Sequence, residues 1–208
     1  MLRFFSISLF LFLSLSSVFG QAGKEKEKTL PEICLSPVEQ ALVNQIMEYR
    51  RQKGLPAVEI SVSLCHVART HAKDQTENYT HGKRCNMHSW SDNGEWTACC
   101  YTADHRKAQC MWDKPRELTN YTGDGFEISF WSTYPYATPE AFAKDILDGW
   151  KKSPGHNDVI VNKNTWKNTT WLAMGVGVYG EYANVWFGKD TDTAGAPEPC
   201  SSEAENAR

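Results

Sequence analysis

The chain has no excess of basic side chains: its 208 residues include 22 Lys and Arg against 25 Asp and Glu. Without surplus cations it is not expected to hold DNA or RNA through phosphate contacts. The chain also lacks an internal repeat, which argues against a solenoid. Its 14 Gly follow no three-residue period, which excludes a collagen. The length predicts one globular domain with tails. The charge balance predicts no nucleic-acid partner.

Several motifs of common enzymes and metal sites are absent as well. No two cysteines are spaced as Cys-x-x-Cys, so a zinc ribbon is rejected. There is no His-Glu-x-x-His, the common zinc-protease helix, and no Gly-x-Ser-x-Gly of a serine hydrolase. A Gly-rich loop for phosphate is also missing. Any site in this chain is therefore expected to combine residues that are far apart in the sequence.

The apolar run at the N-terminus predicts export. Met1-Leu2-Arg3 is a short positive start, residues 4–15 are mostly apolar, and Gly20 is the small residue before a cleavage point. This layout is typical of a secretory signal peptide over residues 1–20. The run is short for a bilayer span, which needs about 20 apolar residues, and no later segment is long enough. We therefore expect a secreted, extracellular protein without a transmembrane anchor.

The cysteines and the glycosylation sequons agree with an extracellular location. Outside the cell most thiols are expected to pair, and seven cysteines allow three bridges and leave one thiol over. Four of them lie in residues 85–110, so this stretch is expected to be cross-linked, and the first and last cysteines could join the ends of the domain. Three Asn-x-Thr sequons are acceptors for N-glycosylation in a eukaryotic secretory pathway. The cysteines are Cys34, Cys65, Cys85, Cys99, Cys100, Cys110 and Cys200, and the acceptors are Asn78, Asn120 and Asn168.

Capping motifs and apolar spacing predict three longer helices. Ser36 caps the first helix, Pro37 takes its first position and Glu39 completes a capping box, before Gly54 ends it. Apolar residues at helical spacing continue this helix and mark the next two. Those two helices are expected over residues 61–75 and from residue 138 to the Ser-Pro-Gly at 153–155, and a short helix could begin near His156.

Two strands close the domain, and polar segments flank it. Residues 172–178 and 183–187 predict a hairpin around a turn, whereas residues 78–121 are predicted to be one long irregular segment. Helices that precede strands without regular alternation favour an α+β fold. The predicted organisation is a signal peptide over 1–20, a charged flexible tail over 21–33, one domain over 34–188 and a flexible tail over 189–208.

Four short motifs occur in a characteristic order. They are Glu48-Tyr49-Arg50, Met87-His88-Ser89, Gly125-Phe126-Glu127-Ile128 and residues 150–157, which end in Ser-Pro-Gly-His-Asn. In this order they resemble the CAP superfamily of cysteine-rich secretory proteins, antigen 5 and pathogenesis-related 1 proteins, and the Ser-Pro-Gly-His ending is more similar to the bacterial-type branch. The resemblance covers about residues 36–188. It implies a three-layer α-β-α sandwich, with helices on both faces of a small antiparallel sheet.

The resemblance also implies a cleft that carries two histidines and two acids. His88 matches the first histidine, His156 is the best match to the second, and Glu127 matches one acid. The family's Gly-Glu-Asn motif is altered here, because Phe126 precedes the acid and Ile128 stands where Asn is usual. The cleft is therefore expected to be lined by His88, Glu127 and His156.

The second acid of the family pattern has no direct match. Its position is Ser153 in this chain, so the match fails there. Asp145 and Asp148, on the preceding helix, are the nearest substitutes, and we expect Asp145 to serve as the second cleft acid.

These side chains suit a divalent metal such as zinc. Two neutral imidazoles offer nitrogen ligands, and a carboxylate behind them can fix a ring's orientation. An open coordination position would also suit activation of water, with Glu127 as the general base. The alternative is a set of hydrogen-bonded polar groups that hold no metal and catalyse no reaction.

The resemblance favours binding over catalysis. Members of the family bind sterols and fatty acids, so the expected partner is such a lipid, a glycan or an extracellular protein. The alternative function is a metal-dependent hydrolase or peptidase that uses the same cleft, and a third is an effector module with an inert cleft. Of the other histidines, His71 is expected to be a hydrogen-bonded core residue, and His105 lies in a loop without an assigned role.

Overall fold

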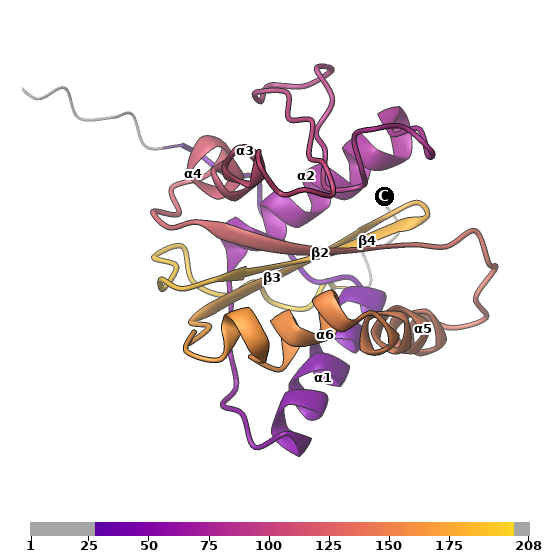
Figure 1. Ribbon diagram of the computed structural model, residues 1–208. Coiled ribbons are helices and arrows are strands. Elements are labelled where there is room, and N and C mark those ends of the chain that lie inside the picture. The colour runs from indigo at the N-terminus through magenta and orange to yellow at the C-terminus, as the bar shows by residue number, and fades with distance from the viewer. Residues whose placement is uncertain (1–27, 202–208) are drawn as a thin grey trace, which may run out of the picture.

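A four-stranded sheet lies between two layers of helices in the computed structural model, which describes residues 28–201 (Figure 1). The signal peptide predicted over residues 1–20 lies outside these residues. The elements are α1 (Pro37–Gln52), β1 (Glu59–Ile60), α2 (Val62–Asn78), α3 (Ala108–Trp112), α4 (Lys114–Leu118), β2 (Gly125–Trp131), α5 (Pro139–Lys152), α6 (Pro154–Ile160), the 3-10 turn η1 (Asn164–Trp166), β3 (Ala173–Tyr179) and β4 (Tyr182–Gly188).

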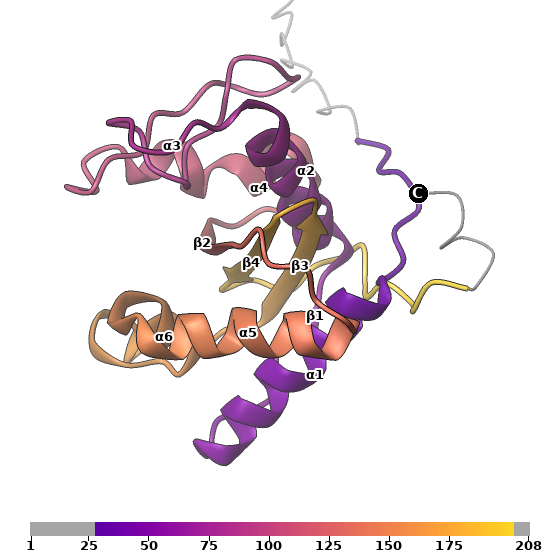
Figure 2. The same ribbon diagram turned by 90° about the vertical axis from the view of Figure 1, so that its right-hand side faces the viewer.

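The three layers confirm the predicted α+β sandwich. Seen along the sheet, α2, α3 and α4 cover one face, and α1, α5 and α6 lie beyond the other (Figure 2). Each face buries its own apolar cluster, because alternate residues of a strand point to opposite faces. The cluster towards α1 and α5 includes Ile46, Ile146 and Val176, and the cluster towards α2 includes Leu64, Val67 and Trp186.

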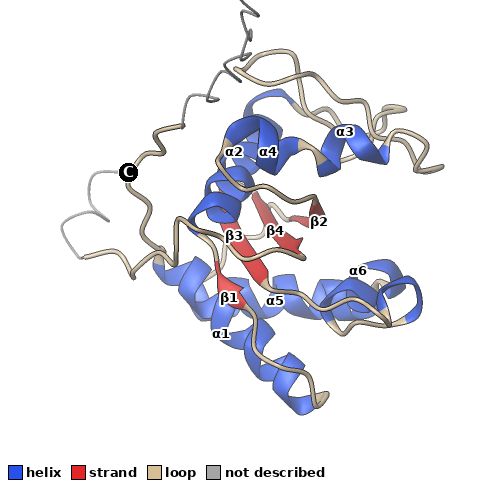
Figure 3. Cartoon of the chain, turned by 90° about the vertical axis from the view of Figure 1, so that its left-hand side faces the viewer, coloured by secondary structure: helices blue, strands red, loops and turns tan. Residues whose placement is uncertain are grey.

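The strand order leaves β2 at one end of the sheet. The order is β1-β3-β4-β2, and both long pairs, β3 with β4 and β4 with β2, are antiparallel. The short β1 pairs with β3 in parallel, so the sheet is mixed rather than antiparallel throughout. Because β2 has a neighbour on one side only, its other edge faces the gap between the two helical layers (Figure 3).

Two glycines in β3 set how closely α2 packs on the sheet. A Cβ at Gly175 would lie 2.1 Å from the main-chain carbon of Leu64, and one at Gly177 would lie 2.2 Å from the main-chain nitrogen of Arg69. Any side chain at these positions would push α2 away from the sheet. The close approach brings His71 of α2 down to the strands.

The local predictions for helix starts and for the hairpin are confirmed. The main-chain N–H of Ser36 donates to Glu39 Oε2 at 2.8 Å, as a capping box requires. The hairpin forms from β3 and β4. Two boundaries differ: α2 continues to Asn78, three residues beyond the prediction, and the stretch predicted to be irregular contains α3 and α4.

Both terminal segments contact the domain where the structure describes them, in contrast to the predicted loose tails. The main-chain N–H of Lys28 donates to Asn120 Oδ1 at 2.9 Å. The Asp192 carboxylate, beyond β4, accepts from the Ser61 hydroxyl at 2.6 Å and the Ser63 N–H at 2.9 Å. It therefore satisfies donors at the start of α2. Residues 190–200 thus belong to the folded unit.

Three disulfides form, as predicted, and one cysteine is left over. Cys34 pairs with Cys200 and joins the ends of the domain. Cys65 is buried and unpaired. Burial raises the pKa of its thiol to about 12, so it is an unreactive core residue. The other two bridges, Cys85–Cys100 and Cys99–Cys110, cross-link the stretch between α2 and α3.

The three sequon asparagines differ in exposure. The side-chain amide of Asn78 donates to Asp74, and that of Asn120 donates to the carbonyl of Lys28. Asn168 is exposed, so it is the acceptor that an enzyme would reach most easily. Within residues 28–201 no helix has the length and apolar character needed to cross a bilayer.

Candidate functional site

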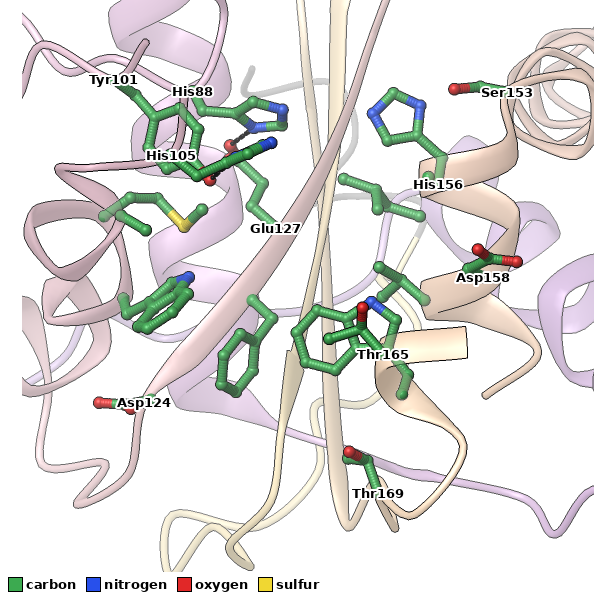
Figure 4. Close-up of a pocket in the computed structure, with 18 of the residues that line it drawn as sticks. His88, Tyr101, His105, Asp124, Glu127, Ser153, His156, Asp158, Thr165 and Thr169 are labelled. Atoms are coloured by element: carbon green, nitrogen blue, oxygen red, sulfur yellow. Dashed lines mark hydrogen bonds and ion pairs between the residues drawn. The ribbon is translucent and has the colours of Figure 1, made fainter. Parts of the chain in front are cut away.

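The unpaired edge of β2 borders a cavity of about 690 Å³ between the two helical layers. Its wall on one side comes from α3 and the disulfide-linked stretch, and its wall on the other side comes from α6 and η1 (Figure 4). The lining residues include His88, Tyr101, His105, Met111, Trp112, Phe126, Glu127, Ile128, His156, Val159, Trp166 and Lys189. The cavity therefore has imidazole groups in one part. The rest is lined by aromatic and aliphatic groups, with Asp124, Asp158 and Lys189 among them.

Glu127 is held between two imidazoles at this edge. Its side chain points to the α2 side of β2 and is fully buried. One carboxylate oxygen contacts Nδ1 of His71, and the other lies 2.7 Å from Nδ1 of His88. Both oxygens are thus engaged by neighbouring side chains, and the Glu127 contact fixes how His88 stands in the cavity.

His71 makes the carboxylate site ionic. Its Nε2 lies 2.9 Å from the main-chain oxygen of Ser89, which can only accept a hydrogen bond, and its ring stacks on Trp90 at 4.3 Å. Burial alone would raise the pKa of Glu127, but the charge and hydrogen bonds of His71 and His88 outweigh it and lower the pKa to about 2. Glu127 is therefore an anion that accepts from His71, which donates from both ring nitrogens.

His156 approaches from the opposite layer. It lies in α6, whose start at Pro154 follows the Ser-Pro-Gly sequence. The ring centroids of His88 and His156 are 6.2 Å apart, across the cavity (Figure 4). Burial, together with the charge of His88, lowers the pKa of His156 to about 4. Its imidazole is consequently neutral at neutral pH and offers a lone pair.

His105 is a cavity residue to which the sequence assigned no role. Its Nδ1 lies 2.8 Å from the Tyr101 hydroxyl, and its main chain has a φ of 56°. This left-handed conformation is uncommon for a residue other than glycine, and no local sequence motif predicts it. His71 is buried, as predicted, but its contact with Glu127 also had no signal in the sequence.

Asp145 does not line the cavity, so its prediction as the second cleft acid is corrected. Its carboxylate accepts from the Tyr136 hydroxyl, in the connection between β2 and α5. Helix α5 turns Ile146 and Trp150 towards the sheet, which directs Asp145 away from the cavity. Asp148 pairs with Lys144 on the outside of the same helix.

The side chains at the cavity do not fit a zinc site of the usual composition. Such a site takes three or four protein ligands, and no group of three or more His, Cys, Asp or Glu side chains in the described part of the chain is arranged to hold a metal. Glu127 already uses both oxygens on imidazoles. The facing imidazoles of His88 and His156 supply two ligands, which is fewer than such a zinc site takes.

We expect the two depressed pKa values to make the fold lose stability in acid in two stages. Above pH 6.5 both contributions are fully present. As the pH falls from 6.5 towards 4, the unfolded chain protonates His156 but the folded chain does not. Between about pH 4.5 and pH 2, the unfolded chain protonates Glu127 but the folded chain does not. Each stage therefore lowers the free energy of unfolding.

Chemical denaturation between pH 7 and pH 4 tests the first stage. For wild type, the loss that His156 causes is on the order of 2–3 kcal/mol, given its pKa of about 4. In the His156→Gln variant, the free energy of unfolding should fall by this much less between pH 7 and pH 4. The same pH dependence of the free energy of unfolding in that variant would contradict the role given to His156.

The three layers, the three bridges and the cavity at the sheet edge define a disulfide-stabilised α-β-α sandwich domain with a histidine-lined site. The chain belongs to the cysteine-rich secretory protein (CAP) family, whose model matches residues 43–188. This family is the one that the order of motifs resembles.

Three bacterial proteins are among the solved structures to which this chain is similar. An extracellular protein containing an SCP domain from Bacillus anthracis is 19% identical, with a TM-score of 0.49, over 73% of this chain and 40% of its own. A cysteine-rich secretory protein from Staphylococcus aureus is 16% identical, with a TM-score of 0.46, over 73% of this chain and 38% of its own. An outer surface protein from Borrelia burgdorferi is 19% identical, with a TM-score of 0.47, over 73% of this chain and 92% of its own.

This chain thus spans about two fifths of the length of the first two of these proteins. No curated protein matches the chain.

Proposed function

We propose that this chain is a secreted binding module and that the cavity beside β2 is its ligand site. A volume of about 690 Å³ lies within the range of roughly 300–1,000 Å³ typical of ligand pockets. The apolar run at the N-terminus and the three disulfides support a place outside the cell. The proposal rests chiefly on the way the cavity combines its polar and apolar walls.

The imidazole end of the cavity provides hydrogen-bonding groups for a ligand. Nδ1 of His88 lies 2.7 Å from the Glu127 carboxylate, so Nε2 is the ring nitrogen of His88 that is left for a ligand. His156 is neutral for the reasons given above. A hydroxyl or N–H group of a ligand that lies between these rings would find an acceptor on His156.

The rest of the cavity suits an apolar body. Phe126 and Trp166 pack with ring centroids 4.9 Å apart, and Met111, Trp112 and Val159 complete the wall. A ligand with an apolar body and a polar end matches both parts. Fatty acids and sterols have this form, and so does a peptide segment with alternating side chains.

A hydrolase that uses Glu127 as its general base is less well supported. The carboxylate is fully buried, and both oxygens are held by histidines. Its pKa of about 2 lies far from the near-neutral value that suits a general base. We therefore propose binding without catalysis.

A bulky side chain at Gly155 tests the cavity as the ligand site. Gly155 lines the cavity in α6, and a Cβ there would meet no atom within 4 Å, so Gly155→Trp should fold and fill the site. The fluorescent dye 8-anilinonaphthalene-1-sulfonate, which has an aromatic body and a polar end, serves as the probe. We expect saturable binding by wild type and an affinity at least about tenfold lower in Gly155→Trp.

Gly155→Ala is the matched control, and its affinity for the dye should stay within about twofold of wild type. Equal melting temperatures of the three proteins would show that the fold is intact. Dye binding that does not saturate, or that Gly155→Trp leaves unchanged, would rule out the cavity as the site.

A further inference from the structure

The floor of the cavity is the unpaired edge of a β-strand. Phe126, Glu127 and Ile128 of β2 line the cavity, and β2 ends the strand order. In Figure 3 this edge lies between α3 on one side and α6 on the other. An edge of this kind presents main-chain N–H and C=O groups that another extended chain can pair with.

Two hydrogen bonds show which main-chain groups of β2 point away from β4. The Ser132 N–H, just beyond β2, donates to Glu181 O at 3.0 Å. Main-chain bonds alternate along an antiparallel strand, so the even-numbered residues of β2 bond to β4. The odd-numbered residues face away from β4, as the bond from Trp150 Nε1 to Ser129 O at 3.0 Å confirms.

Trp150 covers this edge only at Ser129. The main-chain N–H and C=O groups of Gly125 and Glu127 form no hydrogen bond with a side chain in residues 28–201. They also form none with main-chain groups of the described loops and turns. Each of these residues turns one N–H and one C=O away from β4, and Glu127 lines the cavity. Buried main-chain groups need hydrogen-bond partners. A second extended chain presents N–H and C=O groups at the same two-residue spacing and can therefore pair with both residues.

We propose that the ligand of this cavity is an extended peptide segment that adds a strand to β2 at Gly125 and Glu127. This inference rests on the proposed function and names the class of ligand for the same site. The added strand pairs through its main chain, as in other complexes formed by β-augmentation. A fatty acid or a sterol fills the apolar walls but leaves the main-chain groups of the edge to water.

The two walls define alternating subsites for the peptide. Side chains of directly opposed residues in a sheet lie on the same face, so the peptide residue opposite Glu127 points towards His88 and Tyr101. Its neighbours in the peptide point to the other face, where Val159 and Trp166 lie. The first subsite takes a side chain that forms hydrogen bonds, and the second takes an apolar one.

Hydrogen exchange of β2 amides tests the pairing directly. A library of capped random octapeptides is selected on the mature chain, and residue-resolved exchange is measured by NMR with and without the selected peptide. We expect exchange at the Gly125 and Glu127 amides to slow by about tenfold or more, because these N–H groups gain partners. The Phe126 and Ile128 amides already bond to β4 and should change little.

N-methylation of the peptide provides the complementary measurement. Methyl groups on two amides spaced by two residues should each weaken binding by about tenfold or more, and a methyl on the amide between them should be tolerated. Gly155→Trp should abolish peptide binding, and Gly155→Ala should retain it.

Three results would overturn the peptide proposal: no peptide is selected, bound peptide leaves the Gly125 and Glu127 amides unprotected, or methylation has no period of two. If the dye still binds the cavity, each of these results leaves the binding module itself in place. Loss of both dye and peptide binding would count against both proposals.

Discussion

Replacing His71 with Ala is expected to lower the free energy of unfolding by about 3–5 kcal/mol, because it removes one partner of a buried charge. Glu127 is fully buried and anionic, and its two oxygens depend on His71 and His88. The change also leaves the face of Trp90 without its stacked ring. Chemical denaturation at pH 7, with the disulfides intact, measures the loss.

Lys73→Ala is the matched control on the same helix. Its side chain is 57% exposed, so the change should stay within about 0.5 kcal/mol. The double variant His71→Ala with Glu127→Gln separates charge from packing. It should be less destabilised than the two single changes combined, since no uncompensated anion remains. Strict additivity, or a His71→Ala loss as small as that of the control, would refute the ionic contact.

Removing the bridge between Cys34 and Cys200 is expected to have the other large effect. Changing both to Ser should lower the free energy of unfolding by about 5 kcal/mol, because this bridge closes the longest loop and most restricts the unfolded chain. Its cysteines are 166 residues apart in sequence, against 15 for Cys85 and Cys100. Denaturation under non-reducing conditions measures both paired variants.

The Cys85→Ser, Cys100→Ser pair is the comparison, with an expected loss of about 3 kcal/mol from its shorter loop. Both paired variants keep the remaining two bridges, so the difference isolates loop length and the anchoring of the ends. An equal or reversed order of the two losses would mean that the terminal segments contribute little to the folded unit.

Local features of the chain were predictable from sequence because neighbouring residues create them. The capping box at Ser36 and Glu39 forms within one helical turn, and the hairpin of β3 and β4 forms around a short turn. The order of motifs also pointed to His88, Glu127 and His156 as residues of one cleft, and all three line the same cavity. In these cases sequence order and spatial order agree.

Packing between distant elements decided the rest. Asp145 had the right residue type and a nearby position, but the rotation of α5 turns it away from the cavity. His71 had the spacing of a core residue, and only the close packing of α2 on Gly175 and Gly177 brings it to Glu127. His105 enters the cavity through a left-handed main-chain conformation in the cross-linked stretch.

The family, the helix starts, the hairpin and the number of bridges that seven cysteines permit could all be predicted from the order of residues alone. The place of Asp145 away from the histidines, and the edge of β2 as the floor of the cavity, became known from the tertiary structure. Capping and turns depend on a few adjacent residues. Strand order, helix rotation and packing depth depend on contacts across the whole domain, which no short stretch of sequence contains.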